Sequence, residues 1–218
     1  MYFSDDETQQ LNARIRQLEK NTGVELVAAV VGKCDHYPEI PWKAFALGVA
    51  FSSLALLLQA TLRPDWLSSY SALVHTIIVL GVGTIMALLT AVWSGWAHCF
   101  LDSTRAASEM RQYAQSLFLE HDVFATRDRT GLVLLVGLFE RQVVLLTDSG
   151  IDAHLPPGVL QSVIADMTPD LKQGNRFRAL NRGVDLMEEH LCAAGFGPAA
   201  GETDQISETL IQRKGTAE

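Results

Sequence analysis

The sequence predicts a small α/β domain into which a membrane-spanning helical hairpin is inserted. Two long stretches without Asp, Glu, Lys or Arg lie between Lys43 and Asp102. Outside them, segments with apolar residues three or four positions apart alternate with short runs rich in Val and Leu. Such an alternation is typical of a sheet that is covered by helices. We therefore expect a soluble α/β part, made of two separated segments, and an apolar insertion.

The first segment, residues 1–40, predicts one helix followed by one strand. Ser4 and Glu7 have the spacing of a capping box, in which each side chain accepts a hydrogen bond from the backbone of the other residue. Gly23 is a natural stop for a helix whose apolar face carries Leu11, Ile15 and Leu18. The run VELVAAVV at residues 24–31 follows as the first strand.

Residues 41–103 predict a transmembrane helical hairpin. The first uncharged stretch, residues 44–62, would be about 28 Å long as a helix, close to the roughly 30 Å of the hydrocarbon layer. The second is most apolar over about residues 72–97 and is long enough to span with tilt. Buried core helices are the alternative, but aromatic residues at the ends of both stretches favour a membrane: Trp42, Trp66, Tyr70, Trp93 and Trp96.

The orientation of the hairpin follows from its flanking charges. The loop between the spans is short and centred on residues 63–65, so the two parts of the soluble domain would lie on one side of the membrane. The loop offers Arg63 against Asp65, whereas the other flanks carry Lys33, Lys43, Arg105 and Arg111. Short flanks rich in Lys and Arg are cytoplasmic. We expect a two-span inner-membrane protein with its soluble domain and both termini in the cytoplasm.

Residues 130–151 are almost continuously apolar but do not form a third span. A single helix would place Glu140 and Arg141 near the bilayer centre, which costs about 2.5–3.5 kcal/mol for a residue such as Arg. Two strands joined by a tight turn at residues 139–142 place both charges at a surface corner instead. The runs are rich in Val and Leu without clean alternation, as in strands that are covered on both faces. This stretch therefore predicts a strand pair.

The remaining residues predict three helices and a tail. Apolar positions at helical spacing begin at Ala106, a short helix over residues 159–167 is expected to end at Pro169, and a clear stripe runs from Phe177 to Leu191. These elements belong to a second part of the soluble domain, residues 104–196. Residues 197–218 are polar and rich in small side chains, which predicts a disordered tail.

In this order, the segments resemble the TPM domain, a module of plant thylakoid repair proteins and many bacterial membrane proteins. The matching stretches are TGVELVAAVV, TGLVLLVGLFERQVVLLTDSGI and QGNRFRALNRGVDLMEEHL, within about residues 4–40 and 104–196. The closest pattern is the bacterial branch in which a strand–FER–strand unit ends in an Asp-x-Gly-Ile turn. The resemblance implies a three-layer α/β/α sandwich with a two-helix transmembrane hairpin inserted after the first strand.

The family resemblance also implies two kinds of function. Some TPM proteins are metal-binding acid phosphatases, and others are assembly, repair or accessory factors. The phosphatase-like members open the second strand with Asp-Asn-Gly, but here Arg129, Thr130 and Gly131 stand at those positions. Asp148 and Asp152 after the third strand are candidate ligands for Ca²⁺ or Mg²⁺, and Asp128 could join them only if the two loops adjoin. The simpler interpretation is that Asp148 forms the turn itself.

The functional prediction is a non-enzymatic interaction or accessory module for other membrane proteins, held at the lipid bilayer, with no cofactor and no catalytic residue. A metal-dependent phosphatase acting on phosphoesters at the membrane surface is the alternative. A formal net charge of −8 argues against nucleic-acid binding. A basic edge could meet lipid phosphates or an acidic partner, and it contains Lys172, Arg176, Arg178 and Arg182.

Overall fold

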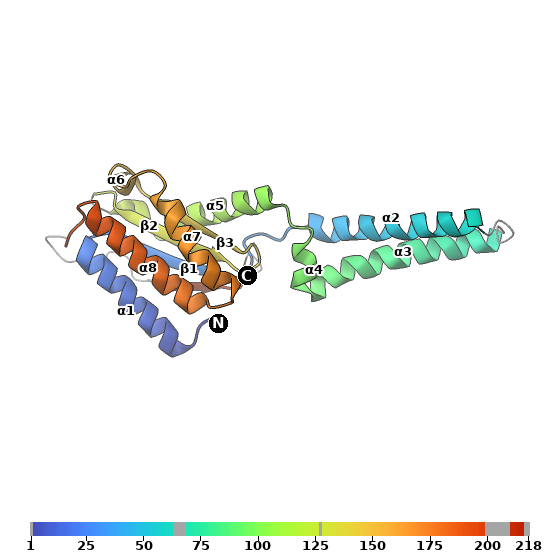
Figure 1. Cartoon of the computed structure of the whole chain (residues 1–218), viewed down its shortest axis with the longest axis horizontal. Coiled ribbons are helices and arrows are strands. Elements are labelled where there is room, and N and C mark those ends of the chain that lie inside the picture. The colour runs from blue at the N-terminus through green and yellow to red at the C-terminus, as the bar shows by residue number, and fades with distance from the viewer. Residues whose placement is uncertain (1, 63–68, 127, 199–209, 216–218) are drawn as a thin grey trace. The chain divides into compact units, whose positions relative to one another are not determined.

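The computed structural model of the 218-residue chain describes residues 2–62, 69–126, 128–198 and 210–215. The chain divides into two compact units. One, here called the sheet unit, comprises Met1–Asp35 and Ala106–Glu218, and the other, the hairpin unit, comprises His36–Arg105. Figure 1 shows the elements of both units along the chain.

The sheet unit is built on a four-stranded sheet with the order β3-β2-β1-β4. Its strands are β1 (Glu25–Val31), β2 (Gly131–Gly137), β3 (Gln142–Thr147) and β4 (Leu210–Arg213). β1 pairs in parallel with both β2 and β4, and β2 pairs with β3 as an antiparallel hairpin. Ala28 of β1 lies opposite Leu134 on one side and Leu210 on the other. The central strand is therefore paired on both edges.

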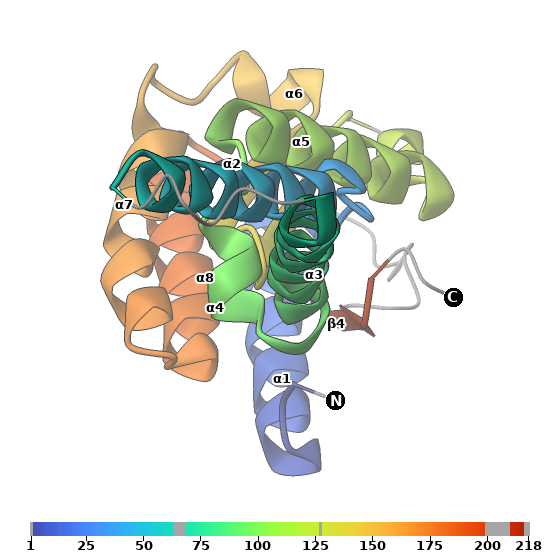
Figure 2. The same ribbon diagram turned by 90° about the vertical axis from the view of Figure 1, so that its right-hand side faces the viewer.

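Helices cover both faces of the sheet. On one face the buried side chains of β1 and β2 pack against α1 (Asp5–Thr22), α7 (Val159–Lys172) and α8 (Arg176–Ala193). On the other face the alternate residues pack against α5 (Ser103–Glu120), which Figure 2 shows on a different side of the unit from α7 and α8. Residues that are neighbours in β1 thus enter two different cores, as in a strand that is buried on both faces. The predicted three-layer α/β/α sandwich is confirmed.

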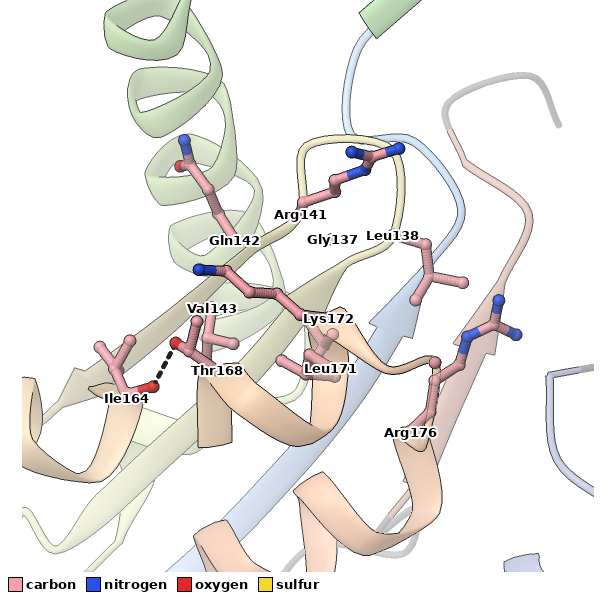
Figure 3. A pocket seen from close by; sticks show the side chains of 12 residues that line it. Gly137, Leu138, Arg141, Gln142, Val143, Ile164, Thr168, Leu171, Lys172 and Arg176 are labelled. Carbon is pink, nitrogen blue, oxygen red and sulfur yellow. Dashed lines mark hydrogen bonds between the residues drawn. The ribbon is translucent and has the colours of Figure 1, made fainter. Parts of the chain in front are cut away.

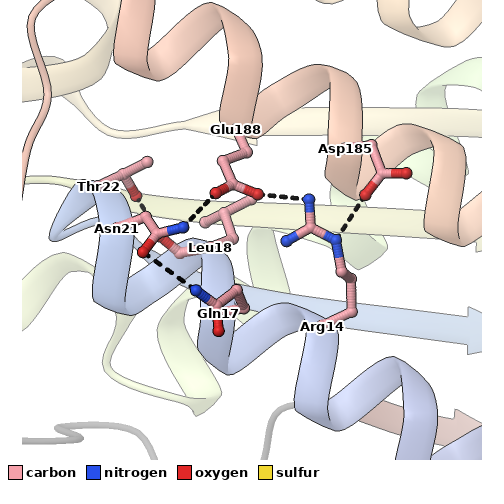
Figure 4. A network of polar contacts seen from close by, with 7 residues as sticks. All are labelled: Arg14, Gln17, Leu18, Asn21, Thr22, Asp185 and Glu188. Carbon is pink, nitrogen blue, oxygen red and sulfur yellow. Dashed lines mark hydrogen bonds and ion pairs between the residues drawn. The ribbon is translucent and has the colours of Figure 1, made fainter.

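Polar groups fix both ends of α1 and hold this helix against α8 at the edge of the first core. The predicted capping box is present, because the Ser4 hydroxyl accepts from the Glu7 amide and the Glu7 carboxylate accepts from the Ser4 amide. At the other end Gly23 closes the helix in the left-handed region at φ 67°. Between these ends Arg14 forms ion pairs with Asp185 and Glu188, and Asn21 donates to Glu188 (Figure 4).

The hairpin unit consists of two long helices and a short one. α2 (Glu39–Leu62) and α3 (Ser69–Val92) pack along each other, and α4 (Ser94–His98) follows. The helices approach closely where Gly48 meets Gly83, since a Cβ on Gly48 would lie 2.9 Å from the Cα of Gly83. Both α2 and residues Tyr70–Val92 of α3 are long and apolar enough to cross a membrane. The inserted apolar hairpin after the first strand is confirmed.

The end of the second long helix differs from the prediction of a span over residues 72–97. α3 ends at Val92, because Trp93 adopts an extended backbone (φ −122°, ψ 100°) and becomes the N-cap of α4. The indole of Trp96 then donates back to the carbonyl oxygen of Met86 at 3.3 Å. The predicted loop around residues 63–65 lies outside the described residues.

Helix α7 does not end at Pro169 but continues to Lys172. A proline inside a helix removes one backbone donor, which usually breaks or kinks the helix. Here Pro169 lies only three residues from the helix end, and the Thr168 hydroxyl donates to the carbonyl of Ile164 at 2.7 Å. The amide of Gln173 still bonds to the carbonyl of Pro169, so the last turn remains closed.

The prediction of a disordered tail over residues 197–218 is wrong for Leu210–Arg213, which form β4. Three contacts hold this short strand besides its pairing with β1. Ile211 is buried in the second core, the Gln212 side chain accepts from the amide of Tyr2, and Arg213 forms a two-point ion pair with Glu120 at 2.6 and 3.0 Å. Residues 199–209 and 216–218 lie outside the described part of the chain.

The prediction that both charges of the β2–β3 turn are exposed is wrong for Glu140. Arg141 is exposed, but Glu140 is only 3% exposed. Its carboxylate oxygen Oε1 accepts a hydrogen bond from the amide of Cys34 at 2.8 Å, and Oε2 lies close to Gly137. A Cβ at position 137 would be 2.7 Å from Oε2 and 2.3 Å from the sulfur of Met110, so a larger residue there would require both side chains to shift. The turn therefore uses a buried carboxylate to hold the chain as it leaves β1.

This contact predicts a difference between two adjacent turn residues. Glu140→Ala leaves the buried amide of Cys34 without its acceptor, which should cost about 1–3 kcal/mol. In a domain of this size that corresponds to a melting temperature lower by about 2–4 °C per kcal/mol. Arg141→Ala, at the exposed position, should stay within about 0.5 kcal/mol of the parent. Thermal unfolding of the two variants checks this, and equal melting temperatures would contradict the role assigned to Glu140.

Candidate functional site

The predicted acidic turn lies directly after β3. Asp148 is the N-cap of α6 (Ser149–Asp152), and its Oδ1 accepts from the amide of Ser149 at 2.7 Å. The backbone carbonyl of Asp148 also accepts from the amides of Ile151 and Asp152. The side chain is buried. Asp148 thus caps the start of this helix, a position at which Asp is favoured.

The structure brings this turn against the loop that precedes β2. The amide of Gly150 donates to the carbonyl of Arg129 at 3.0 Å, and the amide of Asp148 donates to Gly131 at 2.9 Å. A Cβ at position 150 would lie 2.2 Å from the carbonyl oxygen of Asp128, so only glycine permits the contact. The two loops therefore adjoin, although the Asp128 side chain is exposed.

A guanidinium group lies beside the buried carboxylate at this junction. Nε of Arg129 is 3.3 Å from Oδ2 of Asp148, and its Nη1 donates to the carbonyl of Phe124, in the 3-10 helix η2 (Val123–Ala125). Oδ2 accepts no hydrogen bond from the described residues, so Arg129 is the charge that compensates it. Arg129 holds this position with a left-handed backbone, φ 56°. Its position in the chain is one where phosphatase-like TPM proteins carry a carboxylate.

Asp152 also makes a local contact. Its Oδ1 accepts from the hydroxyl of Thr147, the last residue of β3. Two residues later the His154 ring bonds through Nδ1 to the carbonyl of Gly150 at 2.9 Å and packs edge-on against Phe196. The carboxylates of Asp148 and Asp152 are thus both held by neighbours that stabilise the turn.

These residues do not fit a hard divalent cation as they are arranged. Ca²⁺ takes six to eight oxygen ligands, and a positive side chain among them repels it. Here Arg129 already neutralises the buried carboxylate. Across the described ranges, no group of three or more His, Cys, Asp or Glu side chains is close enough to hold a metal ion. As arranged, this turn is therefore poorly suited to bind a divalent cation.

The buried thiol of Cys34 in the sheet unit does not have the surroundings of a nucleophilic cysteine. Cys34 packs against Met110, with 3.1 Å between the sulfur atoms. Burial raises the pKa of the Cys34 thiol, and the carboxylates of Glu140, Asp35 and Glu109 raise it further. A reactive cysteine needs the opposite, a lowered pKa near positive charge.

A pocket of about 610 Å³ lies at the opposite end of the β2–β3 pair (Figure 3). Its polar wall includes Arg141, Gln142, Thr168, Lys172 and Arg176. Two residues of the predicted basic edge, Lys172 and Arg176, are therefore part of it. Sequence patterns did not reveal that Arg141 joins them, because the turn and the two helices come together only in the folded chain.

The other two residues of the predicted basic edge lie apart from this pocket. Arg178 is 3.5 Å from Asp170, and Arg182 is exposed outside the pocket wall. The edge is thus divided into a pair that lines the pocket and a pair that does not.

Comparisons with known proteins agree with this architecture. The family model of the TPM domain matches residues 98–190. This part of the chain is a TPM domain. Two solved structures are similar in fold, and both were determined by NMR. No protein with curated annotation matches the chain.

The first of these structures is the BA42 protein from the psychrophilic bacterium Bizionia argentinensis. It has a TM-score of 0.57 and 14% identity over 97% of this chain and 96% of its own. The second is the N-terminal domain of a protein from P. gingivalis, with a TM-score of 0.51 and 15% identity over 91% of this chain and 83% of its own. At such identities the likeness concerns the fold alone.

The Arg129–Asp148 contact predicts how a metal site could be created in this TPM domain. Arg129→Asp removes the compensating charge and adds a carboxylate, so without divalent cations the variant should melt lower than the parent. Millimolar Ca²⁺ should then stabilise the variant by about 1 kcal/mol or more, a rise of about 2–4 °C. Thermal unfolding with Ca²⁺ and with chelator checks this.

The matched control is Arg129→Gln, which removes the charge without adding a ligand and should not respond to Ca²⁺. A Ca²⁺-dependent rise of equal size in the parent protein would show that the native turn already accepts a cation despite Arg129.

Proposed function

We propose that this protein is a membrane-anchored TPM-domain protein that acts as a non-enzymatic interaction or accessory module for other membrane proteins. The observation that supports the proposal is that both carboxylates of the acidic turn are engaged by neighbouring protein groups. Asp148 caps a helix and is neutralised by Arg129, and Asp152 is held by Thr147. A phosphoryl-transfer site needs a positioned cation and an oriented nucleophile. In this turn the two carboxylates that would hold the cation are instead engaged by Arg129 and Thr147.

The hairpin unit supports the membrane anchor. Large apolar side chains along both long helices are exposed, among them Phe51, Leu57, Ile77 and Leu88. Exposing such an apolar surface to water would be unfavourable in free energy, whereas the hydrocarbon tails of lipids are equally apolar. Close approach of helices through glycine, as at Gly48 and Gly83, is a common packing mode of membrane helices.

Aromatic and charged residues gather where the chain enters and leaves the hairpin. Trp42 near the start of α2 and Trp93 just after α3 are both exposed, as in the aromatic belt at a membrane surface. At the same end Arg105 pairs with Glu39 at 2.9 Å, and Lys43 donates to the carbonyl of Phe100. These cations support a cytoplasmic location for the sheet unit.

The orientation is testable by thiol labelling in intact cells. After Cys99→Ser, an impermeant thiol reagent should label a Pro64→Cys variant from outside, because the loop between the spans would lie beyond the membrane. The exposed Cys192 of the sheet unit should be labelled only after the cells are opened. Labelling of Cys192 in intact cells, with the cysteine at position 64 silent, would reverse the proposed orientation.

The absence of catalysis is testable by turnover. Purified full-length protein should hydrolyse an aryl phosphate no faster than an Asp148→Ala, Asp152→Ala double variant, with or without Ca²⁺ or Mg²⁺. The matched control is Asp166→Ala, Asp170→Ala on α7, which removes the same charge away from the turn. Divalent-dependent turnover that survives in this control and disappears in the turn variant would overturn the proposal in favour of a metal-dependent phosphatase.

A further inference from the structure

The strongest unassigned feature is the pocket at the end of β2 and the start of β3. Its volume of about 610 Å³ is in the range of small-molecule sites. Three cationic side chains line it, and each comes from a different element (Figure 3). Arg141 belongs to the β2–β3 turn, Lys172 to the last turn of α7 and Arg176 to the first turn of α8. Among the residues that the structure describes, no acidic side chain is part of the wall.

The charges of this pocket are not neutralised by the protein. Within the described residues, Arg141, Lys172 and Arg176 form no ion pair, and Arg176 only lies over the ring of Tyr2 at 5.6 Å. The nearby acids are engaged elsewhere, since Asp170 pairs with Arg178 and Glu140 is buried against the amide of Cys34. Three uncompensated cations around one cavity create a positive potential inside it.

The backbone adds to this potential. Asn175, the N-cap of the 18-residue helix α8, makes no side-chain capping bond. The first amide that bonds back into the helix is that of Ala179, to the carbonyl of Asn175. The amides of Phe177 and Arg178 therefore precede the first intrahelical bond, at the positive end of the helix dipole. Gly174 and Arg176 at this end both line the pocket.

Apart from Gln142, Thr168 and two glycines, the rest of the wall is apolar. Val136, Leu138, Val143, Ile164 and Leu171 line the pocket, and all but Val136 are only partly buried by the protein itself. An inorganic ion would use the cations but would leave this surface in water. The wall therefore suits a ligand that joins an anionic group to an organic portion.

We propose that this pocket binds an organic phosphate, with the phosphate group at the cationic rim that Arg141, Lys172 and Arg176 form from different sides, and the organic portion against Leu138, Val143 and Leu171. Arg provides paired donors for phosphate oxygens, and Lys adds a point charge. The same chemistry is offered by a phospholipid headgroup and by a soluble phosphoester. The proposal does not rest on the interaction function above, because the acidic turn lies at the other end of the strand pair.

The test measures binding to the full-length protein in two arms, the first by calorimetry and the second by NMR. In one, protein in neutral detergent is titrated with glycerol 3-phosphate. In the other, protein in phosphatidylcholine nanodiscs is compared with nanodiscs that also contain phosphatidic acid, followed by the amide shifts of Leu171 and Gly174. Saturable binding in the first arm identifies a soluble ligand, and shifts that require phosphatidic acid identify a lipid ligand.

The variants make the test specific to the pocket. Arg141→Gln, Lys172→Gln, Arg176→Gln should weaken binding at least about tenfold, because three charge-assisted contacts are lost. The control is Arg16→Gln, Lys20→Gln, Arg111→Gln, which removes the same charge at exposed positions of α1 and α5 and should bind like the parent. If the pocket triple variant does not fold, the exposed Lys172→Gln alone should still weaken binding about threefold or more.

Two results would overturn the proposal. One is equal affinity of the pocket variants and the control variant, which would mean that binding follows overall charge. The other is that neither probe binds the parent protein saturably.

Discussion

The structure depends on the pairing of β1 along both of its edges. Parallel strands cannot be joined by a tight turn, so the chain must cross over a face of the sheet between β1 and β2. The helix α5 serves this crossover, since Met110, Ala114 and Leu117 pack into the second core. Beyond Cys34, none of the described residues between β1 and α5 belongs to either core of the sheet unit. This separation is what allows a long apolar hairpin to be inserted there without disturbing the fold.

An insertion of this kind requires that the exit from β1 be fixed. The amide of Gly32 donates to Arg213 in β4, while the amide of Phe139 in the β2–β3 turn donates to the carbonyl of Gly32. A Cβ at position 32 would lie 2.4 Å from the carbonyl oxygen of Lys214, so only glycine permits this junction. Two residues later Glu140 accepts from Cys34. The same turn holds Arg141 with φ 55° beside the cationic pocket, so the contacts that secure the exit also position one wall of the proposed site.

Much of this fold could be predicted from local patterns, and its exceptions share one cause. The stripes of α1, α5 and α8, the Ser4 capping box and the strand pair after residue 130 are all visible in short windows of sequence. β4 is not visible in this way, because Leu210–Arg213 is too short to show a pattern. The strand with which it pairs, β1, is also distant in the chain. The burial of Glu140 depends likewise on an amide 106 positions away. At the site, the turn role of Asp148 is local and could be predicted, whereas its pairing with Arg129 and the gathering of Arg141, Lys172 and Arg176 require the assembled tertiary structure.

The two ends of the β2–β3 pair differ in how their charge is balanced. At one end the buried carboxylate of Asp148 has its own guanidinium, so its charge is compensated within the protein. At the other end three cations face a cavity without acids, although the whole chain carries a formal charge of −8. Distant charges are screened beyond about 8 Å at physiological salt, whereas groups that contact a bound ligand are not. The overall negative charge therefore slows the approach of an anion without cancelling its attraction once it is inside. A pocket built this way would select ligands by close contact and shape.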